Sequence, residues 1–251
     1  MVIDFHCHFG KNPKPLNFQK EEDTTAGDIV AAQKRSGIDY STAIPFSAAY
    51  REDLEVANGM MMALRAETLL PSVWLNPYFL RMHDRRGTDE VLLIDLIIKN
   101  NVRGIKVHPV CDAYYPTSRL LGPVFEIARE TELPLLWHTG WGSFGDARYV
   151  EELAEVYGDV QIVIGHMVDQ NAPGIAKRFQ NVYLETSYCS GPRRLAGIVN
   201  MLGSERILFG SDFPAGDLLF QKTLVECAKI PDKDKENILG LNAKRLLNIK
   251  S

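Results

Sequence analysis

The chain has 251 residues, of which 45% are hydrophobic and 24% are charged, and its formal net charge is −4. This length and composition predict a globular protein with a sizeable core and exclude a disordered chain. The slight acidity and the scattered Lys and Arg residues argue against a nucleic-acid partner. Because neither a leader-like N-terminus nor a bilayer-length apolar run is evident, we expect a soluble, cytoplasmic protein without a membrane partner.

Eight short apolar runs, rich in β-branched residues, alternate with helical patterns along the chain. Such alternation predicts a parallel sheet, and eight βα units of about thirty residues each are typical of a single (β/α)8 TIM barrel. No linker interrupts the series, so residues 1–251 are interpreted as one domain. The strands are expected at 2–5, 40–45, 70–75, 102–107, 133–137, 160–164, 182–185 and 206–209.

Nine helices are predicted from apolar periodicity and from residues suited to helix ends. Asp28 is expected to cap the first helix, Gly37 to end it, and Pro123 to lie near the start of the fourth. The helices are expected at 28–36, 52–68, 89–99, 123–130, 147–157, 172–179, 192–202, 218–229 and 233–247.

Side chains suited to metal binding stand at the ends of five of the eight expected strands. They are His6 and His8 on the first strand, His108, His138 and His166 on the fourth to sixth strands, and Asp212 on the eighth. The C-terminal strand ends of an α/β barrel converge at one face, where active sites are built. Since zinc-type ions prefer imidazole nitrogens and a carboxylate, the pattern predicts a metal site at that face. The remaining histidine, His83, is expected on the surface.

The first strand carries its histidines two positions apart. Successive side chains of a strand point to opposite faces, so His6 and His8 are expected on one face and Phe5 and Cys7 on the other. Two imidazoles on one face can bind a single metal ion. Cys7 is accordingly expected to pack outward against the helices.

Six segments together resemble the amidohydrolase superfamily, and within it the amidohydrolase-2 branch, which includes aminocarboxymuconate-semialdehyde decarboxylase and related metal-dependent hydrolases. The resemblance covers nearly the whole chain, and its motifs occur in the family's order. They are Asp4-Phe5-His6-Cys7-His8, Gly104-Ile105-Lys106-Val107-His108-Pro109, Trp137-His138-Thr139-Gly140, Gly165-His166-Met167, Leu208-Phe209-Gly210-Ser211-Asp212-Phe213-Pro214 and Asn242-Ala243-Lys244-Arg245-Leu246-Leu247.

The resemblance implies a barrel enzyme with one divalent metal ion, most commonly zinc. Its ligands would be His6, His8, His138 and Asp212, and His166 would lie beside the metal-bound water. As catalytic residues, Asp212 is expected to take and return a proton, while His166 orients the water or stabilises an oxyanion.

Lys106 occupies the position of a lysine that is carbamylated and bridges two metals in binuclear members of the superfamily. The resemblance to the amidohydrolase-2 branch favours a single ion and an unmodified Lys106, which could bind an anionic substrate. His108, Trp141 and Arg194 are further substrate-binding candidates. The stretch 140–145 matches G-x-G-x-x-G, but His138 directly before it and the missing acidic partner argue against a dinucleotide site, so it is interpreted as a wall that carries Trp141.

Three functions are compatible with this site. The first is hydrolysis of an amide, ester or lactone bond in a small, anionic molecule by zinc-activated water. The alternative is a zinc-dependent, non-oxidative decarboxylase, a lyase acting on a small unsaturated or aromatic acid. The third is a metal-binding barrel without turnover. The expected partner is a small-molecule substrate, and barrels of this kind often form a homodimer.

Overall fold

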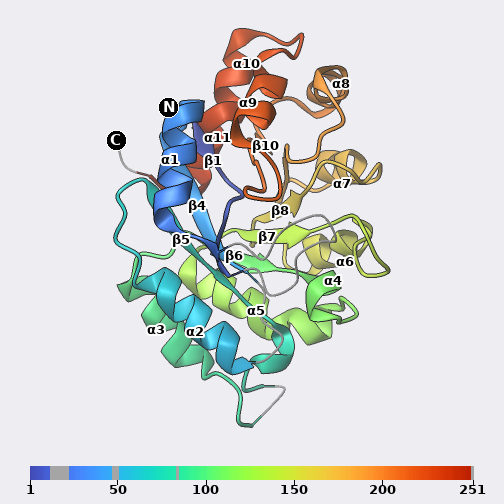
Figure 1. Ribbon diagram of the computed structural model, residues 1–251. Coiled ribbons are helices and arrows are strands. Elements are labelled where there is room, and N and C mark those ends of the chain that lie inside the picture. Colours follow the sequence, from blue (N-terminus) through green and yellow to red (C-terminus); the bar gives the residue numbers. More distant parts are fainter. Residues whose placement is uncertain (12–22, 47–50, 83–84, 250–251) are drawn as a thin grey trace.

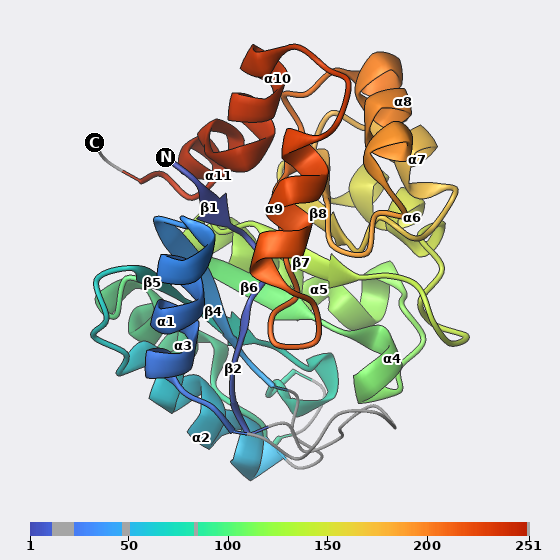
Figure 2. The same ribbon diagram turned by 45° about the horizontal axis from the view of Figure 1, so that its top comes forward.

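A curled, mainly parallel sheet lies at the centre of the molecule and helices surround it (Figures 1 and 2). The computed structural model describes residues 1–11, 23–46, 51–82 and 85–249. Its strands are β1 (Ile3–Asp4), β2 (His8–Lys11), β3 (Asp23–Thr24), β4 (Tyr40–Pro45), β5 (Leu69–Trp74), β6 (Gly104–Val107), β7 (Leu135–His138), β8 (Ile162–Gly165), β9 (Val182–Glu185) and β10 (Ile207–Leu208).

Strands β4 to β10 pair in chain order, each parallel to the next, as the βα alternation predicts. The first strand lies between the two ends of this series. β1 pairs with β4, and on its other side the amide of Phe5 donates to the carbonyl of Phe209 at 2.9 Å. A parallel bridge joins Cys7 to Phe213 further along. These contacts close the predicted TIM barrel, and all eight predicted strands are confirmed.

The first strand is interrupted between β1 and β2. One carboxylate oxygen of Asp4 accepts from the amides of His6, at 3.1 Å, and Ser211, at 2.9 Å, and the other accepts from the Ser211 hydroxyl at 2.6 Å. Burial nevertheless raises the pKa of Asp4 to about 7, against the opposing effect of these bonds. Asp4 therefore ties the first strand to the loop after β10.

This interruption changes where the side chains of the first strand point. Phe5 lines a small space inside the barrel with Lys106 and Leu136, so its expected outward orientation is wrong. The regular alternation fails because the backbone bends where Asp4 binds the amide of His6. Beyond the bend, Cys7 packs against Ile29 and Met61, which confirms its outward orientation.

Helices cover the outer face of the sheet, and most of the hydrophobic core lies between the two layers. They are α1 (Ala26–Ser36), α2 (Arg51–Met62), α3 (Glu90–Lys99), α4 (Pro109–Asp112), α5 (Ser118–Thr131), α6 (Tyr149–Val156), α7 (Ala172–Arg178), α8 (Pro192–Leu202), α9 (Leu218–Glu226), α10 (Asp232–Glu236) and α11 (Asn242–Leu246), with a 3-10 turn at Pro77–Phe79 and a π-turn at Asn237–Leu241. No helix among these described segments is long and apolar enough to cross a membrane.

At two helix starts, a residue other than the expected one caps the helix or begins it. Thr25, rather than Asp28, caps α1, and Asp28 completes a capping box by accepting from the Thr25 amide at 2.9 Å. Gly37 ends the helix in the left-handed region, as predicted. The helix expected to start near Pro123 begins earlier, because Thr117 caps it through the amide of Leu120.

One prediction, the surface position of His83, falls outside the described residues.

Candidate metal centre

Three side chains from the two ends of the chain form a compact triad at the top of the barrel. His6 lies between β1 and β2, His8 begins β2, and Asp212 follows β10. The Nε2 atoms of His6 and His8 lie 3.2 Å apart, and each lies 3.2 Å from Oδ1 of Asp212. Ligands about 2.0–2.1 Å from a tetrahedral zinc ion are separated by about 3.3 Å. The three atoms therefore fit one face of such a coordination sphere.

Four site residues adopt the left-handed backbone conformation that non-glycine residues rarely enter. They are Trp141 (φ 42°), His166 (φ 67°), Tyr188 (φ 55°) and Asp212 (φ 57°), which follow β7, β8, β9 and β10. Such conformations cost free energy and concentrate at functional sites. The same backbone feature thus marks the tops of four consecutive strands.

His138 and His166 form a second imidazole pair. Nδ1 of His138, the last residue of β7, lies 3.0 Å from Nε2 of His166. Among the described residues, two groups of three side chains could each hold a metal ion, His6–His8–Asp212 and His6–His166–Glu185, and neither includes His138. The structure therefore brings three of the four expected ligands together and places the fourth beside His166.

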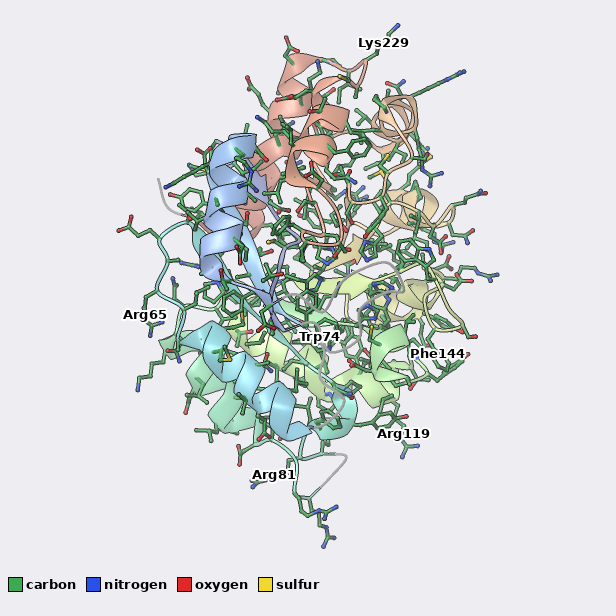
Figure 3. The ribbon with its side chains drawn as sticks, in the orientation of Figure 1. Arg65, Trp74, Arg81, Arg119, Phe144 and Lys229 are labelled. Carbon is green, nitrogen blue, oxygen red and sulfur yellow. The ribbon has the colours of Figure 1, made fainter. Side chains whose placement is uncertain are left out.

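His108 lies between two parallel rings. Its imidazole stacks on that of His138, with ring centroids 3.5 Å apart, and on the indole of Trp74 at 5.2 Å. Trp74 occupies a central position in the molecule (Figure 3). Nδ1 of His108 accepts from the amide of Cys111 at 3.1 Å. This substrate-binding candidate is thus held rigidly next to an expected metal ligand.

Burial keeps three imidazoles of the site, those of His6, His138 and His166, neutral. It lowers the pKa of His6, His138 and His166 well below the usual value, and the nearby Lys106 lowers it further. For Asp212, burial alone would raise the pKa, but its interactions with His6 and His8 and the positive charge of Lys106 lower it overall. Neutral imidazole nitrogens and one carboxylate are the donor set that a divalent ion requires.

Lys106 supplies a buried positive charge beside the triad. The side chain comes from β6, is 1% exposed, and places Nζ 3.2 Å from Nε2 of His6. Burial lowers its pKa to about 8, although Asp212 and Glu185 partly offset this shift. An ammonium group in this position can pair with an anionic substrate.

Aromatic rings form the walls of the site. Phe46 stacks on His8 with ring centroids 4.9 Å apart. Trp141 lies 5.4 Å from the ring of His166 and 5.1 Å from that of Tyr188. Since Trp141 is 59% exposed, its indole offers an accessible flat surface. Such rings favour a planar, conjugated molecule.

Arg194, another substrate-binding candidate, lies in the first turn of α8. It donates to the carbonyl of Asp169 at 3.3 Å, and no hydrogen bond joins it to the triad within the described chain. The glycine-rich stretch forms a tight turn in which the amide of Gly140 donates to the carbonyl of Gly145 at 2.7 Å. Its Phe144 lies toward the edge of the molecule (Figure 3) and packs against Tyr115.

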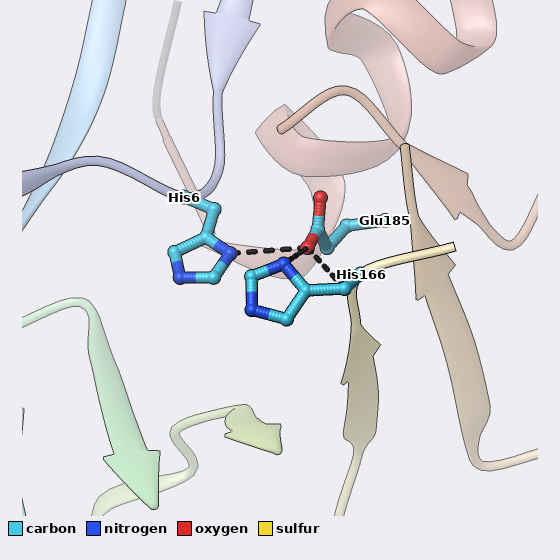
Figure 4. A group of neighbouring side chains, drawn as sticks. All are labelled: His6, His166 and Glu185. Carbon is cyan, nitrogen blue, oxygen red and sulfur yellow. Dashed lines mark hydrogen bonds and ion pairs between the residues drawn. The ribbon is translucent and has the colours of Figure 1, made fainter. Parts of the chain in front are cut away.

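Sequence reasoning missed Glu185, the last residue of β9. Its carboxylate is 0% exposed and lies between His6 and His166 (Figure 4). It accepts from Nδ1 of His6 at 3.0 Å and from the amide of His166 at 2.5 Å. One signal in the sequence was available. Glu185 ends a predicted strand, just as His138 and His166 follow the two strands before it.

The chain belongs to the amidohydrolase family. The family profile described as Amidohydrolase matches residues 3–249, which confirms the predicted resemblance over nearly the whole sequence. None of the curated proteins compared with the chain matches it.

Solved structures of similar fold include two decarboxylases. A 5-carboxyvanillate decarboxylase from Novosphingobium aromaticivorans, solved with manganese and 4-hydroxy-3-methoxy-5-nitrobenzoic acid, is 12% identical, with a TM-score of 0.78 over 99% of this chain and 96% of that chain. The 2,6-dihydroxybenzoate decarboxylase from Rhizobium is 16% identical, with a TM-score of 0.76 over 100% of this chain and 99% of that chain.

A third similar structure bears a hydrolase description. It is a candidate 2-pyrone-4,6-dicarboxylic acid hydrolase from Pseudomonas putida, 16% identical, with a TM-score of 0.72 over 100% of this chain and 98% of that chain. At these identities the three structures establish the barrel fold and leave the reaction to be argued from the site.

Proposed function

We propose that this protein is a metal-dependent decarboxylase that releases carbon dioxide, without oxidation, from a small aromatic or unsaturated acid. The observation that carries the proposal is the buried ammonium group of Lys106 beside the metal-binding triad, in a site walled by Phe46, Trp74 and Trp141. A carboxylate attached to a planar, conjugated body matches both features.

The similar structures favour this reaction over the hydrolysis that the sequence first suggests. Two of the three described above are decarboxylases of substituted benzoates, and one of these was solved with manganese. We propose that a single divalent ion, zinc or manganese, binds to His6, His8, His138 and Asp212. An unmodified Lys106 is part of this proposal.

The proposed reaction replaces a carboxylate group by hydrogen. The bond between the ring or alkene carbon and the carboxylate breaks, carbon dioxide leaves, and the electron pair left on carbon takes a proton. A divalent ion bound at the triad would supply electrostatic stabilisation for the negative charge of the substrate.

The side chains of the site divide the remaining tasks. Lys106 pairs with the anionic substrate, and Trp141 and Phe46 hold its plane. Asp212 takes up a proton from water, delivers it to that carbon and returns to its ionised form, and His166, fixed between Ser187 and His138, orients the reacting group. Catalysis is thus assigned to Asp212 and His166, as the sequence predicts.

Hydrolysis of an amide, ester or lactone is the second candidate. It is favoured by the third similar structure and by the open aromatic wall, which a cyclic ester could also occupy. In that reaction Asp212 would take a proton from water and pass it to the leaving group.

A substrate panel distinguishes the two reactions. The purified protein is loaded with zinc or manganese and incubated with hydroxylated benzoates and unsaturated acids, and carbon dioxide is measured directly. Parallel incubations use lactones, esters and amides of similar size. The Asp212→Asn variant serves as the control for adventitious activity.

We expect carbon dioxide release from at least one acid by the wild-type protein and none by the variant. Lactone, ester or amide cleavage without carbon dioxide release would favour the second candidate. Metal-loaded protein that is inert on both panels would contradict both and favour a barrel that binds metal without turnover.

A further inference from the structure

Glu185 receives four hydrogen-bond donors although it lies entirely inside the protein. Oε1 accepts from Nδ1 of His6 at 3.0 Å and from the amide of His166 at 2.5 Å (Figure 4). It also accepts from the hydroxyl of Ser187 at 2.6 Å. Oε2 accepts from the amide of Ser187 at 2.6 Å. An ionised carboxylate offers about two acceptor sites on each oxygen, so Oε1, the oxygen that faces both histidines, is fully occupied. Glu185 is therefore suited to orient its neighbours rather than to bind a metal ion itself.

The donors fix the direction of each hydrogen bond in a chain of side chains. The hydroxyl of Ser187 gives its single proton to Glu185, so its oxygen must accept from Nδ1 of His166, 2.8 Å away. A neutral imidazole with a proton on Nδ1 carries a lone pair on Nε2. Nε2 of His166 consequently accepts from Nδ1 of His138 at 3.0 Å. Nε2 of His138 is then left without a proton.

A second branch leads from the same carboxylate to the triad. Nδ1 of His6 donates to Glu185, and Nε2 of His6 is thereby left with a lone pair. That atom lies 3.2 Å from Nε2 of His8 and 3.2 Å from Oδ1 of Asp212. Metal-binding histidines typically donate their other ring nitrogen to a carboxylate in this way.

The surrounding backbone leaves room for this carboxylate and little else. A Cβ atom at Gly210 would lie 2.2 Å from Oε2 of Glu185, and one at Gly165 would lie 3.6 Å from Oε1. The close approach of Gly210 therefore requires a residue without a side chain.

We propose that Glu185 is a positioning residue that sets the tautomers of His6, His166 and His138 together. One buried carboxylate would thus leave Nε2 unprotonated on two of the four expected metal ligands, His6 directly and His138 through Ser187 and His166. The inference rests on the proposed metal centre, but not on the reaction that the centre catalyses.

Nitrogen-15 NMR of the imidazoles in the metal-free protein tests the tautomers directly. In the wild type we expect protons on Nδ1 and none on Nε2 for His6, His138 and His166. Histidine-to-glutamine variants assign the signals. Zinc affinity is measured in parallel by competition with a chromophoric chelator.

Two variants separate the branches. Glu185→Gln replaces an acceptor-only group by one with a single acceptor atom, so we expect mixed tautomers at all three histidines and a zinc affinity about 10–100-fold lower. Ser187→Ala cuts only the second branch, so His6 should keep its proton on Nδ1 while His166 and His138 become mixed. Glu155→Gln, an exposed change on α6, is the matched control and should alter neither measurement.

The outcomes are distinct. A proton on Nε2 of His6 in the wild type would overturn the inference, as would unchanged tautomers and zinc affinity in Glu185→Gln. If that variant does not fold, selective loss at His166 and His138 in Ser187→Ala supports the inference, and unchanged tautomers there overturn it. A wild type that binds no zinc overturns the metal centre and this role together. Protein with the expected tautomers and zinc affinities but without carbon dioxide release supports the inference and contradicts only the proposed function.

Discussion

Asp212 is the one carboxylate whose oxygen lies 3.2 Å from the Nε2 atoms of both His6 and His8 among the described residues. We expect Asp212→Asn to lower zinc affinity at least about 100-fold, the upper end of the range for residues that only orient ligands. Chelator competition measures the affinity, and circular dichroism checks that the barrel remains folded. The exposed Asp232→Asn is the control. An unchanged affinity would remove Asp212 from the metal centre.

Gly210 tests how tightly the site is packed at a single position. A methyl group there meets Glu185 at 2.2 Å and Cβ of His6 at 3.2 Å, so Gly210→Ala should lower the free energy of unfolding by about 1–3 kcal/mol. Gly197, inside α8, has open space around it, and its change to Ala should stabilise the protein by roughly 0.5–1 kcal/mol. Denaturant unfolding measures both, and equal effects would contradict the packing argument.

Sequence patterns identify the proposed metal-binding side chains better than the residues that support them. His6, His8 and Asp212 could be found because strand ends of a barrel converge, whatever their distance along the chain. The role of Glu185 was not recognised, because a single acidic residue at a strand end has no distinctive spacing. Its role depends on contacts with His6, 179 residues away, that no local pattern encodes.

The elements β1 and β10 are joined by a polar link rather than by a long ladder of strand pairs. The Ser211 hydroxyl donates to Asp4 at 2.6 Å and accepts from the amide of Phe213 at 3.1 Å. Ser211→Ala leaves both buried groups without this partner, so we expect the free energy of unfolding to fall by about 1–3 kcal/mol. Urea unfolding measures it, with the exposed Ser190→Ala as control. A loss no larger than that of the control would refute the link.

Element positions could be predicted where apolar periodicity is strong. The strands expected at 40–45 and 182–185 coincide with β4 and β9, because both short segments are rich in β-branched and aromatic residues. The break between β1 and β2 could not be predicted, since it depends on bonding between Asp4 and Ser211, 207 residues apart. The start of α5 was predicted too late, because Pro123 was taken to mark the helix start and the capping residue Thr117 was not recognised.

For the molecule as a whole, metal binding should stabilise the fold. The proposed ligands come from both ends of the chain, so an ion at the triad would add a link across the point where the barrel closes. At a free zinc concentration 100-fold above the dissociation constant, the free energy of unfolding should rise by about 2.7 kcal/mol. For a chain of this size that corresponds to a rise in Tm of about 5–10 °C.

Thermal unfolding with zinc, and again after addition of a chelator, measures this stabilisation. The Asp212→Asn variant should show a much smaller rise at the same zinc concentration. A Tm that is independent of zinc in the wild type would contradict the link between metal binding and barrel closure.

The fold could be predicted because it follows from repeated βα units, and the strand-end residues predict the candidate metal centre that we propose. The choice between decarboxylation and hydrolysis could not be predicted, because it depends on how side chains of different strands meet. Lys106 beside His6, and Trp141 beside Tyr188, are contacts of that kind. Sequence patterns place each residue on an element but do not place the elements' side chains against one another.

Anomalous X-ray diffraction from crystals of the zinc- or manganese-loaded protein tests the metal centre most directly, because it locates each ion and identifies it by element. We predict one ion per chain, within about 2.0–2.3 Å of Nε2 of His6, His8 and His138 and of a carboxylate oxygen of Asp212. An ion bound instead by Glu185, two ions bridged by Lys106, or no ion at the triad would contradict this prediction.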